Sequence, residues 1–383
     1  MPFYKPLKDV PKKERIRTIA GIERLRAQFK EGNFPIKKAE ESLILGTWNI
    51  RNFDDDRFNY GPRLTESFYY LAEIISRFDV MAIQEVCVDL WPLDKLMSIL
   101  GREYDYIMTD VTHSSLGGNS ERLGFIYNKK KVRFTGVAGE IVLPDKLLIN
   151  DGKKNKQFSR TPFGVSFQAG WFKFQFSTVH IYFGSNSGNS PQYARRVKEI
   201  DTVARYLAKE AKNADANHIL VGDFNIKSKD SDGFNALEKR GFKVVSNRKG
   251  SNKDQTKYYD QISFRSRKNE LELMDPKRDN RVIQYFDSIF RDEDYELYKP
   301  VMLDRIASKI EEAQKELSEA TSKTAKKRFT KRIAGLEEIQ ASEEELQKYY
   351  HNWKTFQASD HLPLWVEIKI DFSSEYLEYL KEY

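Results

Sequence analysis

The residues best suited to chemistry lie in the segment His218–Asn225, which reads HILVGDFN. Its apolar run Ile219–Val221 is typical of a buried strand, and Gly222 lets the backbone turn without a side-chain clash. Asp223 and Asn225 would point the same way if the chain stays extended. An Asp can accept a proton from water, and an Asn can hydrogen-bond a phosphoryl oxygen. Because Gly, Asp and Asn are also common turn residues, this motif alone leaves both hydrolysis and a plain turn open.

Two further apolar runs carry polar residues at their ends. Leu43–Trp48 is a predicted strand followed by Asn49, and Val80–Ile83 is a predicted strand followed by Gln84 and Glu85. A glutamate beside a buried run is costly unless it is paired or bound to metal. Asn and Glu supply hard oxygen ligands, and Mg²⁺ takes one or two carboxylates while it keeps waters and substrate phosphate. Asn49 and Glu85 therefore predict a metal site.

Polar residues also adjoin the remaining predicted strands. They are Glu121 before Leu123–Tyr127, Arg160 before Phe163–Gln168, His180 at the end of WFKFQFSTVH, Asp260 in YYDQISF, and Ser359, Asp360 and His361 before Leu364–Ile370. A single histidine is more often structural than functional, and an arginine clamps phosphate only in suitable surroundings. So many complementary side chains beside apolar strands are hard to attribute to chance, and together they predict one site.

Helical patterns separate these strands. Pro11–Lys30 predicts an outer helix packed through Ile16, Ile19 and other apolar residues, and Leu64–Phe78 and Tyr193–Leu207 predict amphipathic helices. The order strand, helix, strand implies a mixed sheet covered by helices. The basic segment 239–257 is predicted to be a flexible loop, which could touch a phosphate backbone if it borders the site.

A helical hairpin is predicted near the carboxyl end of the chain. Apolar residues recur three or four apart on both sides of a polar break at Ser322–Thr324: Ile306, Ile310, Ala313, Leu317 and Ala320 before it, then Phe329, Ile333 and Leu336. Ser342 and Glu345 predict a capping box that opens a further helix toward Tyr350. The hairpin is interpreted as a solvated brace, with a partner-binding arm as the alternative.

Composition limits the class of protein. The chain has 383 residues, with 64 Lys and Arg against 57 Asp and Glu, so its net charge is +7, which gives a hint of a nucleic-acid partner. Its single cysteine, Cys87, cannot form an intramolecular disulfide, and the amino terminus is charged where a signal peptide would be apolar. No apolar run approaches the roughly 20 residues of a transmembrane helix. We therefore expect a cytoplasmic protein that does not use a membrane; its oligomeric state is left open.

The motifs TWN, QE, the strand-ending His180, GDFN, YDQI and SDHLP, in this order and spacing, resemble the endonuclease/exonuclease/phosphatase superfamily. The resemblance covers Ser42 to about Phe290 and Gln357–Ile370. It implies a four-layer α/β sandwich, in which two packed mixed sheets are flanked by helices, and a divalent-metal phosphoesterase in which water attacks phosphorus in line. The expected organisation is a helical extension (1–41), a catalytic domain (42–300 and 352–372), the hairpin insertion (301–351) and a tail (373–383).

The resemblance also implies roles for residues. Asn49 and Glu85 would hold Mg²⁺ or Mn²⁺ with Asp360 nearby, and the metal would neutralise the phosphate. Asp223 would orient or deprotonate the attacking water, and Asn225 would hold the water or the phosphate.

The histidines and arginines take the remaining roles. His361, paired with Asp260, would bind or protonate a phosphate oxygen, because the carboxylate favours the imidazolium form. His180 would be the second such histidine, supported by Glu121. The expected substrate-binding residues are Arg160, Arg51 and Tyr127.

The motifs resemble most closely the deoxyribonuclease I branch, with two departures. Members of that branch carry an arginine directly after IQEV and an Arg and Tyr before the ER strand, which enter the DNA minor groove. Here these places hold Cys87 and the small run Gly117–Ser120. We expect a nuclease with little sequence preference, DNA favoured over RNA. The alternatives are a phosphoesterase acting on a small-molecule or lipid phosphoester, and a non-catalytic scaffold; the scaffold is disfavoured because none of the principal site residues is lost.

Overall fold

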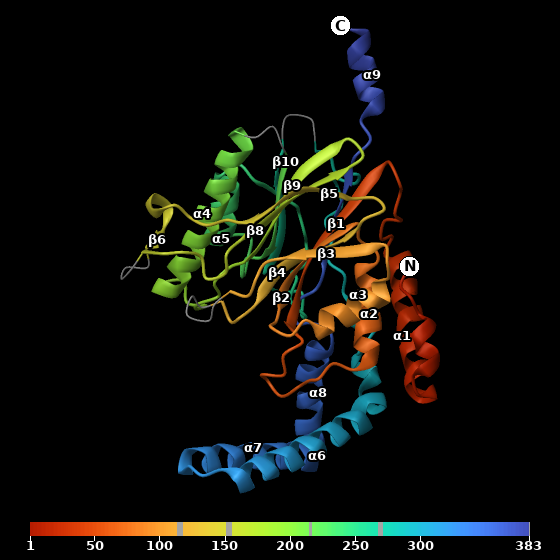
Figure 1. Ribbon diagram of the computed structural model, residues 1–383, viewed down its shortest axis with the longest axis vertical. Coiled ribbons are helices and arrows are strands. Elements are labelled where there is room, and N and C mark those ends of the chain that lie inside the picture. Colours follow the sequence, from red (N-terminus) through yellow and green to blue (C-terminus); the bar gives the residue numbers. More distant parts are fainter. Residues whose placement is uncertain (113–117, 151–154, 214–216, 267–270, 383) are drawn as a thin grey trace.

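Two β-sheets pack face to face between helices in the computed structural model, which describes residues 1–112, 118–150, 155–213, 217–266 and 271–382 (Figure 1). The four-layer α/β sandwich predicted from the sequence is confirmed. Aromatic side chains fill the space between the sheets, where Phe125 of one sheet stacks on Phe163 and Phe176 of the other at ring distances of 5.7 and 5.1 Å. These rings fix the separation at which the two sheets can present side chains to each other.

The first sheet has five strands in the order β13-β1-β2-β4-β3. Its strands are β1 (Ser42–Phe53), β2 (Val80–Val86), β3 (Tyr104–Met108), β4 (Arg122–Asn128) and β13 (Leu364–Lys369). β1 and β2 are parallel and place Asn49 beside Gln84, while β13 and β4 run antiparallel to them. The ladder shifts after these residues, so the carboxyl ends of β1 and β2 leave the regular sheet together.

The second sheet has six strands in the order β11-β12-β10-β9-β8-β5. Its strands are β5 (Arg133–Glu140), β8 (Phe163–Ala169), β9 (Phe172–His180), β10 (Asn217–Asp223), β11 (Lys243–Val244) and β12 (Asp260–Arg265). β10 pairs parallel with β9 and antiparallel with β12, and the register sets Asp223 beside both His180 and Asp260. A small separate ladder joins β6 (Ile149–Asn150) and β7 (Asn155–Lys156).

Helices cover the outer faces of both sheets. α1 (Lys12–Glu31), α2 (Thr65–Ile75) and α3 (Trp91–Leu100) lie on one side, and α4 (Pro191–Asn213) and α5 (Asp232–Lys239) lie on the other (Figure 1). Ile200, Val203 and Leu207 of α4 bury their side chains in a cluster with Leu220 of β10. Short 3-10 helices span Lys5–Asp9, Asp145–Leu147, Tyr285–Asp287 and Asp292–Asp294. None of the helices in the described chain is long and apolar enough to cross a membrane.

The predicted hairpin forms from α6 (Tyr295–Glu319) and α7 (Lys323–Ala341), and α8 (Glu343–Gln357) leads back to the sheets. α6 begins before the predicted boundary because Tyr298 and Met302 are fully buried in the main core. Ser342 Oγ accepts a hydrogen bond from Glu345 N at 3.3 Å, which provides the predicted cap of α8. Beyond β13 the chain ends in the exposed helix α9 (Ser373–Lys381).

Four local expectations from the sequence are wrong. Asn49 lies inside β1, because the strand continues to Phe53. The chain turns after β10 instead of staying extended, since Asn225 has a φ of 55°. Ile16 and Ile19 are 57% and 40% exposed, because α1 packs through a stripe that contains Ile22, Leu25 and Phe29.

The fourth is the segment 239–257, expected to be flexible. It is held by hydrogen bonds, such as those from Gly250 N to Gln255 O at 3.0 Å and from Ser251 N to Lys257 O at 2.7 Å.

Candidate active site

Asp223 lies at the centre of a group of polar side chains between the two sheets. Its Oδ2 accepts a hydrogen bond from Asn49 Nδ2 at 3.1 Å and lies 3.5 Å from His180 Nε2 and 3.7 Å from His361 Nε2. Its Oδ1 accepts a hydrogen bond from the backbone N–H of Asn225 at 2.8 Å. The side chain is almost fully buried. One carboxylate oxygen is thus fixed by the backbone, and the other faces an amide and two imidazoles.

Asn49 and Glu85 form the part of the site that suits a metal ion. Asn49 Nδ2 also donates to Glu85 Oε1 at 2.9 Å, and Glu85 Oε2 accepts from Asn52 N at 2.8 Å. Glu85 has a φ of 63° at the point where the ladder between β1 and β2 shifts. Asn49 Oδ1 is buried and has no hydrogen-bond partner among the described residues. A buried amide oxygen without a partner is costly, so this atom fits a role as ligand to a hard cation.

His361 is held by Asp260. Its Nδ1 lies 2.8 Å from Asp260 Oδ2, and Asp260 N donates to Ser251 Oγ at 2.9 Å. Burial lowers the pKa of His361, but the carboxylates of Asp260 and Asp223 outweigh burial and hold this pKa well above its ordinary value. The ring is therefore in its protonated imidazolium form, with Nε2 directed toward Asp223.

His180 faces a second carboxylate. Its Nδ1 lies 3.2 Å from Glu121 Oε2, an ion-pair distance without the alignment of a hydrogen bond, and Arg160 Nε donates to the same oxygen at 2.7 Å. Burial raises the pKa of Glu121, but the interactions with His180 and Arg160 outweigh burial and lower this pKa to about 2. Each histidine of the site therefore has its own buried carboxylate.

Two sets of acidic and histidine side chains in the described part of the chain are close enough to share an ion. They are Glu85 with Glu121 and His180, and Asp223 with Asp260 and His361; within each set the ligand atoms lie within 4.8 Å of one another. Asp360 is in neither set. Its side chain is 46% exposed, and its Oδ1 lies 4.0 Å from Arg51 Nε. The predicted metal ligands therefore separate into Asn49 and Glu85, which are in contact, and Asp360 at the rim.

Three other predicted site residues have different surroundings. Asn225 Nδ2 donates to the backbone oxygen of Ile181 at 2.8 Å, so half of its donor capacity holds the chain. Arg51 lies at the rim, where Nη1 donates to Thr355 Oγ1. Tyr127 does not lie at the site, so the expectation that it binds substrate is corrected. It pairs with Val80 at the opposite end of β2 and stacks in the core at 5.3 Å from the ring of Phe167.

Residues that sequence reasoning gave no role position the site. Ser359 Oγ donates to Asn49 O at 2.6 Å and accepts from His361 N at 3.1 Å, so it ties β1 to the turn before β13. Gln84 Nε2 donates to Thr178 Oγ1 at 2.9 Å and joins β2 to β9 across the two sheets. Gln84 and Ser359 belong to the motifs QE and SDHLP, which was the available signal.

Glu199 of α4 is a further positioning residue without a recognisable signal. Its fully buried carboxylate accepts hydrogen bonds from Ser159 N at 3.3 Å and from Tyr182 N at 3.1 Å. These two residues stand next to Arg160 and two residues after His180. Because the bonds join α4 to two loops distant in sequence, no local pattern indicates them.

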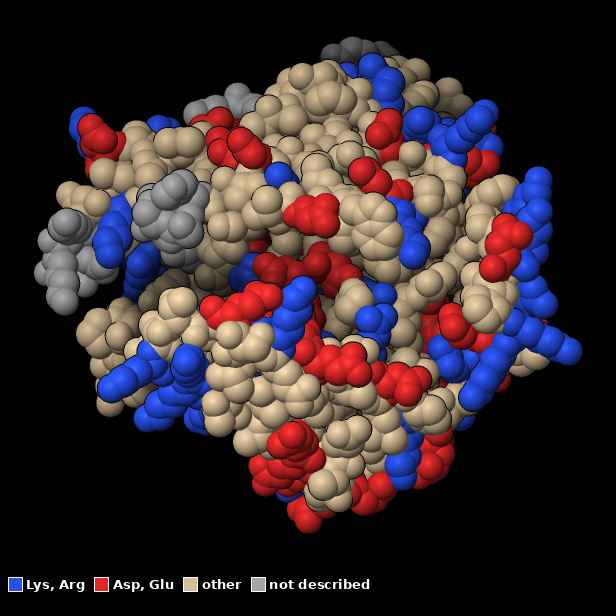
Figure 2. Space-filling view, turned by 60° about the horizontal axis from the view of Figure 1, so that its bottom comes forward, with Lys and Arg blue, Asp and Glu red and all other residues tan. Residues whose placement is uncertain are grey.

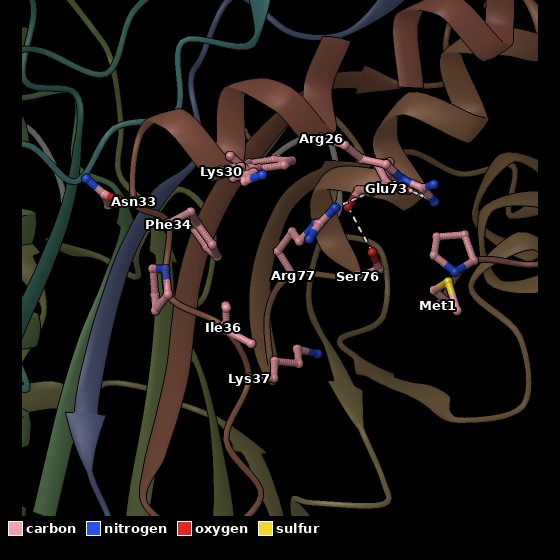
Figure 3. A pocket seen from close by; sticks show the side chains of 13 residues that line it. Met1, Arg26, Lys30, Asn33, Phe34, Ile36, Lys37, Glu73, Ser76 and Arg77 are labelled. Atoms are coloured by element: carbon pink, nitrogen blue, oxygen red, sulfur yellow. Dashed lines mark hydrogen bonds and ion pairs between the residues drawn. The ribbon is translucent and has the colours of Figure 1, made fainter. Parts of the chain in front are cut away.

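A separate cavity lies away from this site. It measures 830 Å³ and opens between α1, α2 and the segment 33–37, where Arg26 and Arg77 both pair with Glu73 (Figure 3). Arg77 lies before β2, whereas Glu85 lies near its carboxyl end, and the strand from Val80 to Glu85 alone spans about 17 Å at 3.3 Å per residue. In a view that brings the α8 end of the molecule forward, acidic side chains gather in a hollow with Lys and Arg around it (Figure 2).

The fold and the site define a hydrolase of the two-sheet α/β class that acts on phosphoesters. The sequence matches the model of the Endonuclease/Exonuclease/phosphatase family over residues 46–291, and the chain belongs to this family. Among curated proteins, no relative matches the sequence.

Three solved structures are similar to this chain at low identity. An endonuclease/exonuclease/phosphatase family protein from Bacteroides thetaiotaomicron is 16% identical, with 87% of this chain and 99% of that chain covered and a TM-score of 0.50. A mannosyl-6-phosphatase from the same species is 17% identical, covering 60% and 87% at a TM-score of 0.45. The catalytic domain of human Nocturnin is 13% identical, covering 61% and 84% at 0.46.

Proposed function

We propose that this protein is a divalent-metal-dependent nuclease that hydrolyses phosphodiester bonds of nucleic acid, with DNA favoured and little sequence specificity. The observation that carries the proposal is the position of Asp223, buried between two carboxylate-supported histidines and hydrogen-bonded to Asn49. This arrangement provides a base or orienting group for water and two cationic or neutral imidazoles for phosphate oxygens, which is what in-line attack on phosphorus requires.

Each side chain has one task in this proposal. Asn49 and Glu85 would hold Mg²⁺ or Mn²⁺, which would supply positive charge next to the phosphate and the leaving oxygen. Asp223 orients the attacking water and accepts its proton at Oδ2, the oxygen that faces Asn49 and the two histidines, while Oδ1 is held by the backbone N–H of Asn225. His361 remains protonated beside Asp260 and donates from Nε2 to a non-bridging phosphate oxygen. His180 binds a second oxygen, held by Glu121.

The choice of nucleic acid rests on cations around the site. Arg51 and Arg160 flank it, and the net charge of the chain is +7. Arg57 supports the choice further: its Nη2 lies 3.9 Å from Cys87 Sγ and 3.4 Å from Asn119 O. Cys87 and Asn119 belong to the two places where the sequence departs from the deoxyribonuclease I branch. Gly117, in the second of these places, lies outside the described residues. Arg57, which comes from another segment, thus lies beside the positions at which this sequence lacks the basic residues of that branch.

The test is hydrolysis of labelled duplex DNA, single-stranded DNA, RNA and a small bis-phosphodiester, each with Mg²⁺, Mn²⁺ or EDTA. Asp223→Asn and His361→Gln run beside the native protein, with circular dichroism to confirm folding. We expect metal-dependent cleavage of a polynucleotide that falls about 10²- to 10⁴-fold in either variant, the usual contribution of general acid–base groups. Turnover of the small diester alone would establish instead a phosphoesterase that acts on a small-molecule or lipid phosphoester. Cleavage that persists in both variants would remove the roles assigned here.

A further inference from the structure

The α7 helix of the hairpin carries a row of exposed lysines. Lys323, Lys327 and Lys331 are spaced four residues apart, so they lie one above another on a single face at intervals of about 6 Å. Phe329 and Leu336 are buried on the opposite face. We call the three lysines the α7 lysine row. All three are exposed, and this side of the helix is turned away from the packing face.

The α7 lysine row is not neutralised within the described part of the molecule. Arg332, on the flank of α7, pairs with Glu312 at 3.1 Å and Glu316 at 2.9 Å of α6, so these two carboxylates are already engaged by another cation. No ion pair joins any lysine of the row to a described residue. Three unpaired cations at regular spacing raise the local positive potential without stabilising the fold.

The hairpin is firmly mounted on the segments that carry the site. α8 has 15 residues, so it spans about 22 Å, and its last residue, Gln357, stands two residues before Ser359. On α6, Lys309 Nζ donates to Asp56 Oδ2 at 2.8 Å, in the segment that follows β1. Lys309 is only 6% exposed, so this contact is part of the hairpin's base. The hairpin is therefore an arm that projects from the site region (Figure 1).

We propose that the α7 lysine row binds the phosphate backbone of a polynucleotide whose scissile bond lies in the catalytic site. The inference rests on the proposed nuclease function and adds its substrate class: a strand long enough to contact the site and the α7 lysine row at once, in place of a dinucleotide or small phosphoester. Lysines at regular spacing bind phosphates as point charges with no base readout, which agrees with low sequence specificity. The row could also bind an acidic protein surface. Such a partner would not need the direct connection that α8 makes between the hairpin and the turn before β13 at the site.

The test replaces the row by neutral residues of similar length, Lys323→Gln, Lys327→Gln and Lys331→Gln together. The matched control is Lys12→Gln, Lys13→Gln and Lys30→Gln on α1, which removes the same charge from exposed positions on another part of the surface. Both triple variants are combined with His361→Gln, and binding of fluorescent single-stranded DNA of about 6 and about 40 nucleotides is measured by anisotropy over a series of KCl concentrations. In the otherwise native enzyme, kcat and KM are measured on the long strand and on a small bis-phosphodiester.

We expect the row variant to bind the long strand at least 10-fold more weakly at low salt than the control. The slope of log K against log [KCl] should fall by about 2, since single strands release about 0.7 counterion per phosphate contact. Binding of the short strand and kcat on the small diester should not change. Equal binding of the long strand by the two triple variants would overturn the inference, and so would an equal loss for both lengths.

Failure of the inference and failure of the proposed function give different results. If the native enzyme cleaves polynucleotides and the row variant matches the control, the arm does not bind substrate although the nuclease stands. If no polynucleotide is cleaved but the row variant loses long-strand binding, the arm binds nucleic acid and the catalytic assignment is wrong. Binding to vesicles of anionic lipid is measured as well. If the row variant loses binding to vesicles but binds DNA as the control does, the ligand of the row is a lipid surface and not nucleic acid.

Discussion

At the scale of single residues, the unpaired Oδ1 of Asn49 is the most informative atom of the site. It is buried beside Glu85, and in the described chain no donor satisfies it. A group whose lone pairs point at nothing within the protein is either a defect or a ligand. Its position beside a carboxylate, at the point where two parallel strands leave the sheet, favours a ligand.

Replacing Asn49 should therefore remove metal binding that can be measured without substrate. At 100 times its dissociation constant, a bound metal stabilises the native protein by about 2.7 kcal/mol. We expect Mg²⁺ or Mn²⁺ to raise the Tm of the native protein and to have little effect on Asn49→Ala, as measured by scanning calorimetry. Asn49→Asp keeps an oxygen at this position, so its Tm should still respond to metal. An unchanged metal response in Asn49→Ala would show that the ion is held elsewhere.

Glu121 should make stability depend on pH. Its pKa is about 2 in the folded protein and near 4.5 when unfolded, so ionised Glu121 stabilises the fold above pH 4.5 and this contribution is lost as pH falls through 2. The full contribution is about 3 kcal/mol. We expect the free energy of unfolding of the native protein and of Glu121→Gln, from urea titrations, to converge by about this amount between pH 5 and pH 2. Parallel curves across that range would contradict the pairing with His180 and Arg160.

At the scale of elements, the site depends on how closely β9 and β10 approach each other. Gly222 of β10 has a φ of 129° and pairs with Val179, and a Cβ placed on Gly222 would lie 2.1 Å from Val179 O. The glycine thus provides both an unusual backbone conformation and space for the neighbouring strand. The next residue on each strand is a site residue, so this contact sets the distance between Asp223 and His180.

Gly222→Ala should damage both stability and activity. The added methyl group cannot be accommodated unless β10 moves away from β9, so we expect a loss of more than about 3 kcal/mol in the free energy of unfolding, and lower hydrolysis even where the variant remains folded. Gly139→Ala on β5 is the matched control, since no atom lies within 4 Å of its added Cβ. Urea unfolding and kcat of both variants test this, and a Gly222→Ala variant as stable as the control would show that the strands have more room than the structure indicates.

At the scale of the whole molecule, one apolar core connects the catalytic sheets with the hairpin. A single buried cluster extends from Leu7 to Ile370 and includes Met302 and Ile306 of α6, Leu336 of α7 and Trp353 of α8. A second buried cluster lies under α4. The hairpin therefore shares its base with the main core instead of hanging from a linker.

This continuity predicts cooperative unfolding of the hairpin with the sheets. We expect far-UV circular dichroism, which is dominated by the helices, and tryptophan fluorescence, which reports on Trp48 in β1 as well as Trp353 in α8, to give coincident urea transitions. An early loss of helical signal at constant fluorescence would mean that α6 and α7 unfold separately. Such a result would favour the interpretation of the hairpin as an independent arm.

Local patterns in the sequence predict much of the fold and of the candidate site. Apolar runs, helical periods and strand-adjacent polar residues predicted a mixed sheet covered by helices, the hairpin and the set of side chains that lie around Asp223, and the family resemblance added the four-layer sandwich. Local signals also carried the family resemblance, since each motif is a few residues long.

Which of these residues meet depends on how distant segments of the chain pack together. Tyr127 follows the same strand pattern as the site residues, but the register of β4 places it at the far end of the sheet. Arg57, Glu199 and Ser359 contact segments that are distant from them in sequence. Register and the packing of one sheet on the other set these contacts, and both arise from pairings across the whole chain that no short window of sequence contains.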